Sequence, residues 1–251
     1  MKKARNVLAL TLAVVLTAGA LSACGGKTSS APESAGTTAA GGSESVAPAA
    51  GGESARDTLR VALTSEPPNL STCDHDSLIS VGMNMLTFNG LVRIDNASLK
   101  PELDLASDYK VENDVDWIFT LKQGVKFHNG DDFTAADVVA TLEYAKSLPA
   151  TTTYTSNMKS IEAVDDFTVK ITTNEPYAGL LYDLGYHFNW ILPKGLIESG
   201  NDFNENPIGT GPYKLVEWVS GDHLTFEAFD DYFDAERKAK IKNLEFTIIP
   251  E

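Results

Sequence analysis

From residue 57 onward, two spacings of apolar residues alternate along this chain. Leucine and valine occupy every second position in 58–63, and tryptophan, phenylalanine and leucine do so in 117–122. A period of two is typical of a strand with one buried face. Apolar residues in 135–146 instead recur at helical spacing. The chain therefore mixes strands with helices, and we predict an α/β fold.

The sharpest local signals lie between residues 117 and 146. Strand 117–122 is followed by Gln123-Gly124, a turn, and by 125–127, which continues the alternation. This pattern predicts a hairpin. Thr134 precedes Asp137 by three positions, which is a capping-box pattern with Asp in place of Glu. A helix is predicted to start at Thr134.

Two further segments have a clear apolar pattern. Residues 77–88 are dense in leucine, isoleucine, valine and methionine, and they are predicted to form a largely buried helix. Residues 187–194 begin with a run of aromatic and aliphatic side chains, and they are predicted to form a strand.

The first 23 residues have the form of a secretory signal. Lys2, Lys3 and Arg5 precede an uncharged apolar run at 7–21. Those 15 residues are too few to span a hydrocarbon core, which takes about 20 residues in a helix. Residues 1–23 are therefore predicted to be a signal peptide.

Residues 24–56 form a low-complexity segment of Gly, Ser, Ala, Thr and Pro without an aromatic residue. Such a composition cannot bury enough apolar surface to offset the entropy of ordering the chain. It predicts a flexible tether whose coil dimension is about 30 Å.

Composition limits the partners. Removal of Lys2, Lys3 and Arg5 leaves 17 basic residues against 35 acidic ones, a formal charge of −18. Nucleic acid is excluded as a partner, because it requires a basic footprint. Cys24 and Cys73 are the two cysteines, so an acylated Cys24 would leave one free thiol and no intramolecular disulfide.

Residues 117–138 read W-x-F-x-L-K-x-G-V-K-F-H-N-G-x-x-F-T-A-x-D-V, and residues 207–213 read P-x-G-T-G-P-Y. Both runs closely resemble motifs of the family 5 extracellular solute-binding proteins, the peptide, nickel and opine receptors of bacterial ABC importers. The ending Leu-Ser-Ala-Cys at 21–24 resembles a lipobox, in which Cys24 would be diacylated and become the mature N-terminus. An ordinary signal peptidase site after Ala23 or Ala20 is the alternative.

The resemblance implies a periplasmic-binding-protein-like lobe. Residues 57–251 would form the N-terminal lobe, with a mixed sheet from strands near 58, 213, 224 and 244. An α+β subdomain would be inserted at about 89–205. Family members continue for about as long again, so we expect this sequence to be truncated, to lack the second lobe and to bind solute weakly by itself.

Candidate site residues are few. In the family, the segment after the first strand runs along the ligand cleft, so the backbone of Thr64, Ser65 and Glu66 is expected to line it. The alternative is a plain strand-exit loop. The run 73–76, Cys-Asp-His-Asp, could suggest a metal, but such sites need three or four converging ligands. We expect a polar loop there, no metal and no cofactor.

The resemblance implies a lipid-anchored binding component that captures a peptide or a similar small solute and passes it to ABC permease subunits. It would lie outside the cytoplasm, held to the cell membrane by its anchor. A non-transport sensor or ligand carrier on the same fold, or an inactive fragment, remains the alternative. An enzyme is not expected, because no nucleophile elbow, H-E-x-x-H or paired-histidine pattern occurs.

Overall fold

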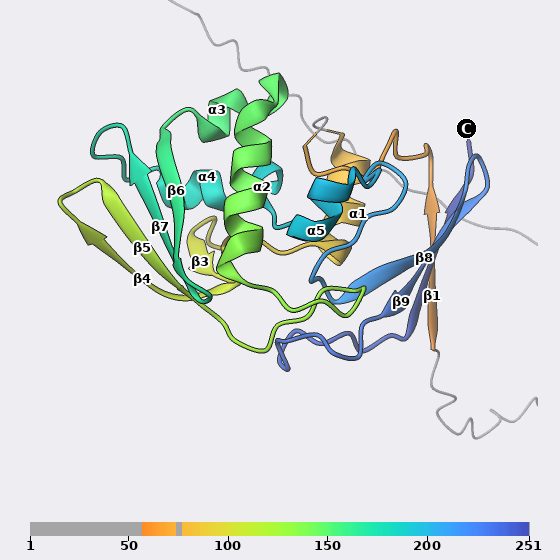
Figure 1. Cartoon of the computed structure of the whole chain (residues 1–251). Helices are drawn as coiled ribbons and strands as arrows, with labels where there is room; N and C mark the ends of the chain where they lie inside the picture. The colour runs from red at the N-terminus through yellow and green to blue at the C-terminus, as the bar shows by residue number, and fades with distance from the viewer. Residues whose placement is uncertain (1–56, 74–76, 251) are drawn as a thin grey trace, which may run out of the picture. The chain divides into compact units, whose positions relative to one another are not determined.

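The computed structural model describes residues 57–73 and 77–250 (Figure 1). Cys24, the signal 1–23 and the tether lie outside the described residues. The strands are β1 (Thr58–Leu63), β2 (Val92–Ile94), β3 (Pro101–Leu103), β4 (Ala106–Glu112), β5 (Asp116–Leu121), β6 (Met158–Asp165), β7 (Thr168–Thr173), β8 (Tyr213–Val219), β9 (His223–Ala228) and β10 (Asn243–Ile248). The helices are α1 (Leu78–Thr87), α2 (Ala135–Ser147), α3 (Thr152–Thr155), α4 (Leu180–Gly185) and α5 (Lys194–Ser199), with 3-10 turns η1 (Pro149–Thr151) and η2 (His187–Asn189). Within these ranges, no helix has the length and apolar character that crossing a membrane requires.

Strands from the two ends of the described chain form one sheet. Its order is β1-β10-β9-β8, with β1 parallel to β10 and the other neighbours antiparallel. The predicted mixed sheet is therefore confirmed. One face packs against α1 and the loop before it, through a core made of Leu70, Met83, Leu224, Phe226, Leu244 and Phe246.

A second, antiparallel sheet has the order β4-β5-β7-β6. Trp117, Phe119 and Leu121 on β5 are buried, while their neighbours are more exposed, as the period of two predicted. Helix α2 packs on β6 and β7 (Figure 1). The larger hydrophobic core of the described chain lies between this sheet and its helices.

The predicted hairpin at 117–127 is wrong. Strand β5 is paired on its two sides by β4 and β7, so neither edge is open to residues 125–127. Those residues instead close a tight loop of their own. The backbone N–H of Phe127 donates to the carbonyl of Asp131 (2.9 Å), and that of Phe133 donates to Val125 (3.0 Å).

Helix α2 begins as its sequence predicted. The Asp137 carboxylate accepts hydrogen bonds from the backbone N–H of Thr134 (2.8 Å) and from its hydroxyl (3.0 Å). The other Asp137 oxygen accepts the N–H of Lys194 at 2.8 Å. The capping residue therefore also fixes the start of α5 against α2.

Helix α1 has nearly the predicted bounds but is not largely buried. Leu78 is 88% exposed and Met85 49% exposed, whereas polar Asn84 is 1% exposed. The Asn84 amide donates to the carbonyl of Ser71 at 3.0 Å. The helix thus turns a polar side to the preceding loop, because the carbonyls of that loop need donors.

The predicted strand at 187–194 is also wrong. Residues 187–189 form the 3-10 turn η2, closed by the N–H of Asn189 on the carbonyl of Tyr186 at 3.0 Å. The backbone N–H of Ile191 donates to the carbonyl of Asn89 at 2.9 Å. Its buried aromatic side chains give this segment the composition of a strand, but it pairs with no strand of the described chain.

Gly209 and Gly211 lie where two segments cross. A Cβ on Gly209 would lie 2.2 Å from the carbonyl oxygen of Thr87, and one on Gly211 would lie 2.4 Å from that of Leu86. The His128 ring contacts both glycines of this crossing. Its Nε2–H donates to the carbonyl of Gly211 (2.9 Å), and its Nδ1 faces the N–H of Gly209 (3.4 Å). Burial lowers the pKa of His128 from 6.5 to about 4, so the ring is neutral at pH 7.

A buried polar junction lies beside this crossing. The Asn89 amide donates to Asp104 (2.8 Å) and accepts the Thr210 hydroxyl (3.0 Å). The Arg237 guanidinium pairs with the other Asp104 oxygen, and the Asp104 side chain is only 3% exposed. Four distant segments are thereby held together, and the buried carboxylate has the partners that its charge requires.

Candidate functional site

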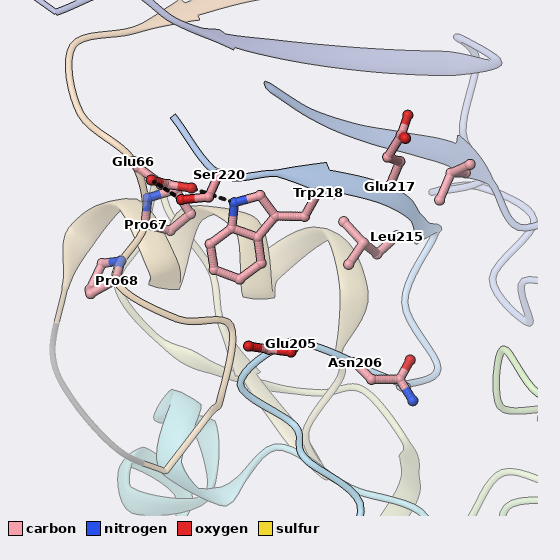
Figure 2. A pocket seen from close by; sticks show the side chains of 10 residues that line it. Glu66, Pro67, Pro68, Glu205, Asn206, Leu215, Glu217, Trp218 and Ser220 are labelled. Carbon is pink, nitrogen blue, oxygen red and sulfur yellow. Dashed lines mark hydrogen bonds between the residues drawn. The ribbon is translucent and has the colours of Figure 1, made fainter. Parts of the chain in front are cut away.

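A cavity of about 700 Å³ lies along β8, which is an edge strand of the mixed sheet in the described chain (Figure 2). Three separate segments enclose it: the loop after β1, residues 205–206, and β8 with the turn that follows it. The lining residues are Glu66, Pro67, Pro68, Glu205, Asn206, Leu215, Val216, Glu217, Trp218 and Ser220.

The Glu66 carboxylate joins the loop after β1 to the β8–β9 turn. It accepts the indole N–H of Trp218 at 2.6 Å, the hydroxyl of Ser220 at 3.1 Å and the backbone N–H of Gly221 at 3.1 Å. Two prolines follow it and cannot join a strand ladder, since each lacks a backbone donor. The chain therefore leaves the sheet here, and Glu66 ties the departing loop back to it.

Of the three residues that the sequence assigned to a cleft, only Glu66 lines this cavity. Thr64 and Ser65 are exposed and are not part of its wall. Glu66 takes part through its side chain, whereas the prediction concerned its backbone. Contact of these residues with a solute stays a prediction, and so does lipidation of Cys24, which lies outside the described residues.

Trp218 was not predicted from the sequence to line a binding site. It stands on β8, and its ring packs with the core under the mixed sheet. The register of β8 against β9 shifts between Leu215 and Glu217, as at a β-bulge. In Figure 2 the indole is drawn between the Glu66–Ser220 pair and Glu205, whereas Glu217 points away from it. Leu215 and Trp218 both pack against the core under the sheet although they lie three positions apart. The bulge between them breaks the period of two that would otherwise have indicated the side of the strand on which Trp218 lies.

The cavity wall is acidic. Glu66, Glu205 and Glu217 line it, and no lysine, arginine or histidine is among its lining residues. Glu217 lies 3.4 Å from His223, a half-buried ring whose pKa is raised first by its hydrogen bond to Asp222. The cavity thus offers hydrogen-bond acceptors and an aromatic surface.

Cys73, the first residue of the Cys-Asp-His-Asp run, lies in the core at 1% exposure. Its thiol faces the carbonyl of Phe188 at 3.6 Å. The carbonyl of Thr72 is 3.1 Å from Nδ1 of His187. Within 57–73 and 77–250, no group of three or more His, Cys, Asp or Glu side chains is placed to hold a metal ion. Residues 74–76 lie outside that description.

The two sheets with their covering helices define a mixed α/β, periplasmic-binding-protein-like fold. The solved oligopeptide-binding protein AppA from Bacillus subtilis, in complex with a nonapeptide, superposes with a TM-score of 0.69 at 28% sequence identity. That similarity covers 77% of this chain and 40% of AppA.

Residues 100–251 match the family described as "Bacterial extracellular solute-binding proteins, family 5 Middle". The chain belongs to this family, as its two motifs predicted. Its members bind solutes and are not enzymes, which confirms the expectation that the chain is not an enzyme.

Two curated relatives show what the similarity covers. The glutathione-binding protein GsiB of Salmonella paratyphi A is 33% identical over 186 residues, which make up 72% of this chain and 36% of GsiB. The HTH-type transcriptional regulator SgrR of Photorhabdus laumondii is 31% identical over 164 residues, which make up 65% of this chain and 28% of SgrR. The chain thus spans about a third of the length of these relatives.

Proposed function

We propose that this chain is the solute-binding component of an ABC importer, which captures a peptide or a similar small solute outside the cytoplasm and passes it to permease subunits. The observation that carries the proposal is the match of residues 100–251 to the family of extracellular solute-binding proteins. A peptide-bound relative and a glutathione-binding one favour a peptide-like solute. The chain binds and releases the solute without changing it.

The proposed organisation has three parts. Residues 1–23 direct export, acylated Cys24 anchors the chain to the outer side of the membrane, and the tether 24–56 gives the folded part reach. Two acyl chains are needed because a single chain gives only marginal membrane binding. Replacement of Cys24 by Ser is expected to move the protein from the membrane fraction to the soluble one; full membrane retention would contradict the anchor.

Residues 57–251 are proposed to be an N-terminal lobe, with a subdomain inserted at about 89–205. The division of the sheets supports this organisation. Strands β4 to β7 of the second sheet all fall inside 89–205, whereas β1, β8, β9 and β10 all fall outside it. Each sheet also has its own core cluster.

Solute uptake by the host tests the proposal. Uptake of a labelled peptide mixture is compared in strains that carry the wild-type protein, a Trp218→Ala variant or a Tyr182→Ala variant. Trp218 lines the cavity, whereas Tyr182 is a 51% exposed aromatic on α4 that does not. We expect Trp218→Ala to reduce uptake of at least one peptide and Tyr182→Ala to leave it unchanged. Equal uptake by all strains, including one without the protein, would refute import.

One observation favours a second function. The match to SgrR, which by its name is a transcriptional regulator, indicates that this fold also occurs outside transport. A non-transport sensor would bind solute without affecting uptake. In the same strains, a transcriptional response that requires the protein, together with unchanged uptake, would identify a sensor. Loss of uptake without such a response would identify the importer component.

A further inference from the structure

The three carboxylates of the cavity along β8 are not equivalent. Glu66 accepts three hydrogen bonds, from Trp218, Ser220 and Gly221. Glu217 faces His223 at 3.4 Å and points away from the indole in Figure 2. Glu205 is exposed, and among the described residues its carboxylate has no hydrogen bond or ion pair. Glu205 is therefore the carboxylate that a bound molecule can use.

Trp218 gives the cavity a fixed aromatic surface. A hydrogen bond of 2.6 Å from its indole N–H to Glu66 restricts rotation of the ring, and packing into the core under the sheet holds its other side. Of the aromatic rings, tryptophan attracts a cation over its face most strongly. A carboxylate on the other side would form the shorter, stronger hydrogen bonds that ionised partners make.

Neutral or anionic groups fit this wall less well. No lining residue carries a positive charge to pair with an anion, and the chain has a formal charge of −15. The residues that enclose the cavity also include Pro67, Pro68 and Leu215, which offer apolar surface for a short alkyl chain. The wall is complementary to a molecule with an apolar stem and a cationic head.

We propose that the cavity binds an organic cation, an alkylammonium or guanidinium group, between the Glu205 carboxylate and the Trp218 ring, with Glu66 positioning that ring. This inference rests on the proposed function, since it names the chemical class of the solute. The cation is either a free small molecule or a lysine or arginine side chain of a peptide, because both present the same head group.

Indole N–H signals in ¹H–¹⁵N spectra of the full chain report on the site directly. The chain has three tryptophans, and a Trp218→Phe variant assigns the Trp218 signal. Butylguanidinium is the cationic probe and N-butylurea is its neutral counterpart of nearly equal shape. We expect butylguanidinium to shift the Trp218 signal saturably and N-butylurea to leave it unchanged. A blocked Gly-Arg-Gly peptide and its citrulline analogue test the peptide source in the same way.

Two variants that each remove one negative charge test which carboxylate binds the cation. Glu205→Gln is expected to weaken butylguanidinium binding about tenfold, which corresponds to about 1.4 kcal/mol. Glu236→Gln removes another exposed carboxylate, one outside the cavity, and is expected to change nothing. Glu66→Gln keeps an acceptor for the indole N–H and should bind better than Glu66→Ala. An unchanged spectrum outside the cavity checks that each variant is folded.

Three results would overturn the inference: no saturable shift with either cationic probe, equal binding of the urea or citrulline analogues, or undiminished binding by Glu205→Gln. These results differ from failure of the proposed function. Peptide uptake that depends on Trp218 but not on the charge of the peptide would leave the importer role standing and remove only the cationic preference.

Discussion

Acidification tests the half-buried histidine at the glycine crossing. His128 is neutral in the folded chain: its Nε2–H donates to the carbonyl of Gly211 at 2.9 Å, and its Nδ1 faces the N–H of Gly209. A proton on Nδ1 would oppose that N–H and would bring a charge into a desolvated place near Lys214. Folding therefore disfavours protonation, and the pKa of His128 falls from 6.5 to about 4.

The sign of the effect follows from this depression. Above pH 6.5 the ring is neutral in both the folded and the unfolded chain, so the stability is undiminished. Between pH 6.5 and 4 only the unfolded chain binds the proton, so the free energy of unfolding falls as the pH falls. The two pKa values, 6.5 and about 4, correspond to about 3 kcal/mol in full, and partial exposure of the ring reduces this to about 2 to 3 kcal/mol.

Urea unfolding of the wild type and a His128→Gln variant, followed by circular dichroism at pH 7, 6, 5 and 4, measures this contribution. Gln can still donate to Gly211 but does not titrate. The wild type is expected to lose about 2 to 3 kcal/mol more than the variant between pH 7 and pH 4.

His223 provides the control of opposite sign. It is half-buried, and its pKa is raised by Asp222 first and by Glu217 after it. Its contribution is present below pH 6.5 and is lost as the pH rises through its raised pKa. A His223→Gln variant should therefore keep the acid-side loss seen in the wild type. Parallel pH profiles for the wild type and His128→Gln would refute the assignment of a neutral, desolvated His128.

Three further predictions concern stability, each measured by urea unfolding at pH 7. Arg237→Met leaves the buried Asp104 carboxylate without its charged partner and should cost about 3 to 5 kcal/mol; a loss below about 1 kcal/mol would show that Asp104 is solvated. Asp137→Ala removes the capping box of α2 and should cost about 1 to 2 kcal/mol; an unchanged midpoint would contradict this. Gly209→Ala should destabilise the chain by more than about 2 kcal/mol, because its Cβ meets a backbone oxygen. Gly195→Ala, a position with nothing within 4 Å of the added Cβ, should be neutral or slightly stabilising; equal effects of the two changes would contradict the close crossing.

Local signals predicted local structure. The Thr134–Asp137 pair predicted the start of α2, because both groups that make the cap lie within one helical turn. The alternation in 58–63 and 117–122 predicted β1 and β5. The partners of β5 could not be predicted in this way, because β4 and β7 pair with it through contacts that its own sequence does not encode.

The cavity could not be predicted from the sequence for the same reason. Glu66 and Trp218 are 152 positions apart, and neither residue stands in a motif that indicates their hydrogen bond. The prolines after Glu66 explain why the chain leaves the sheet there, since neither has a backbone donor. The family motif at 207–213 indicated the fold, and its glycines are explained by the crossing with α1 rather than by a ligand.

The central claim is that this chain holds a small solute and releases it unchanged. The most direct measurement incubates the full chain with a defined peptide mixture at millimolar concentration and analyses the retained and released molecules by mass spectrometry. The account predicts saturable retention of particular peptides and their recovery with unchanged mass. Recovery of cleaved or modified products, or no saturable retention of any peptide, would contradict it.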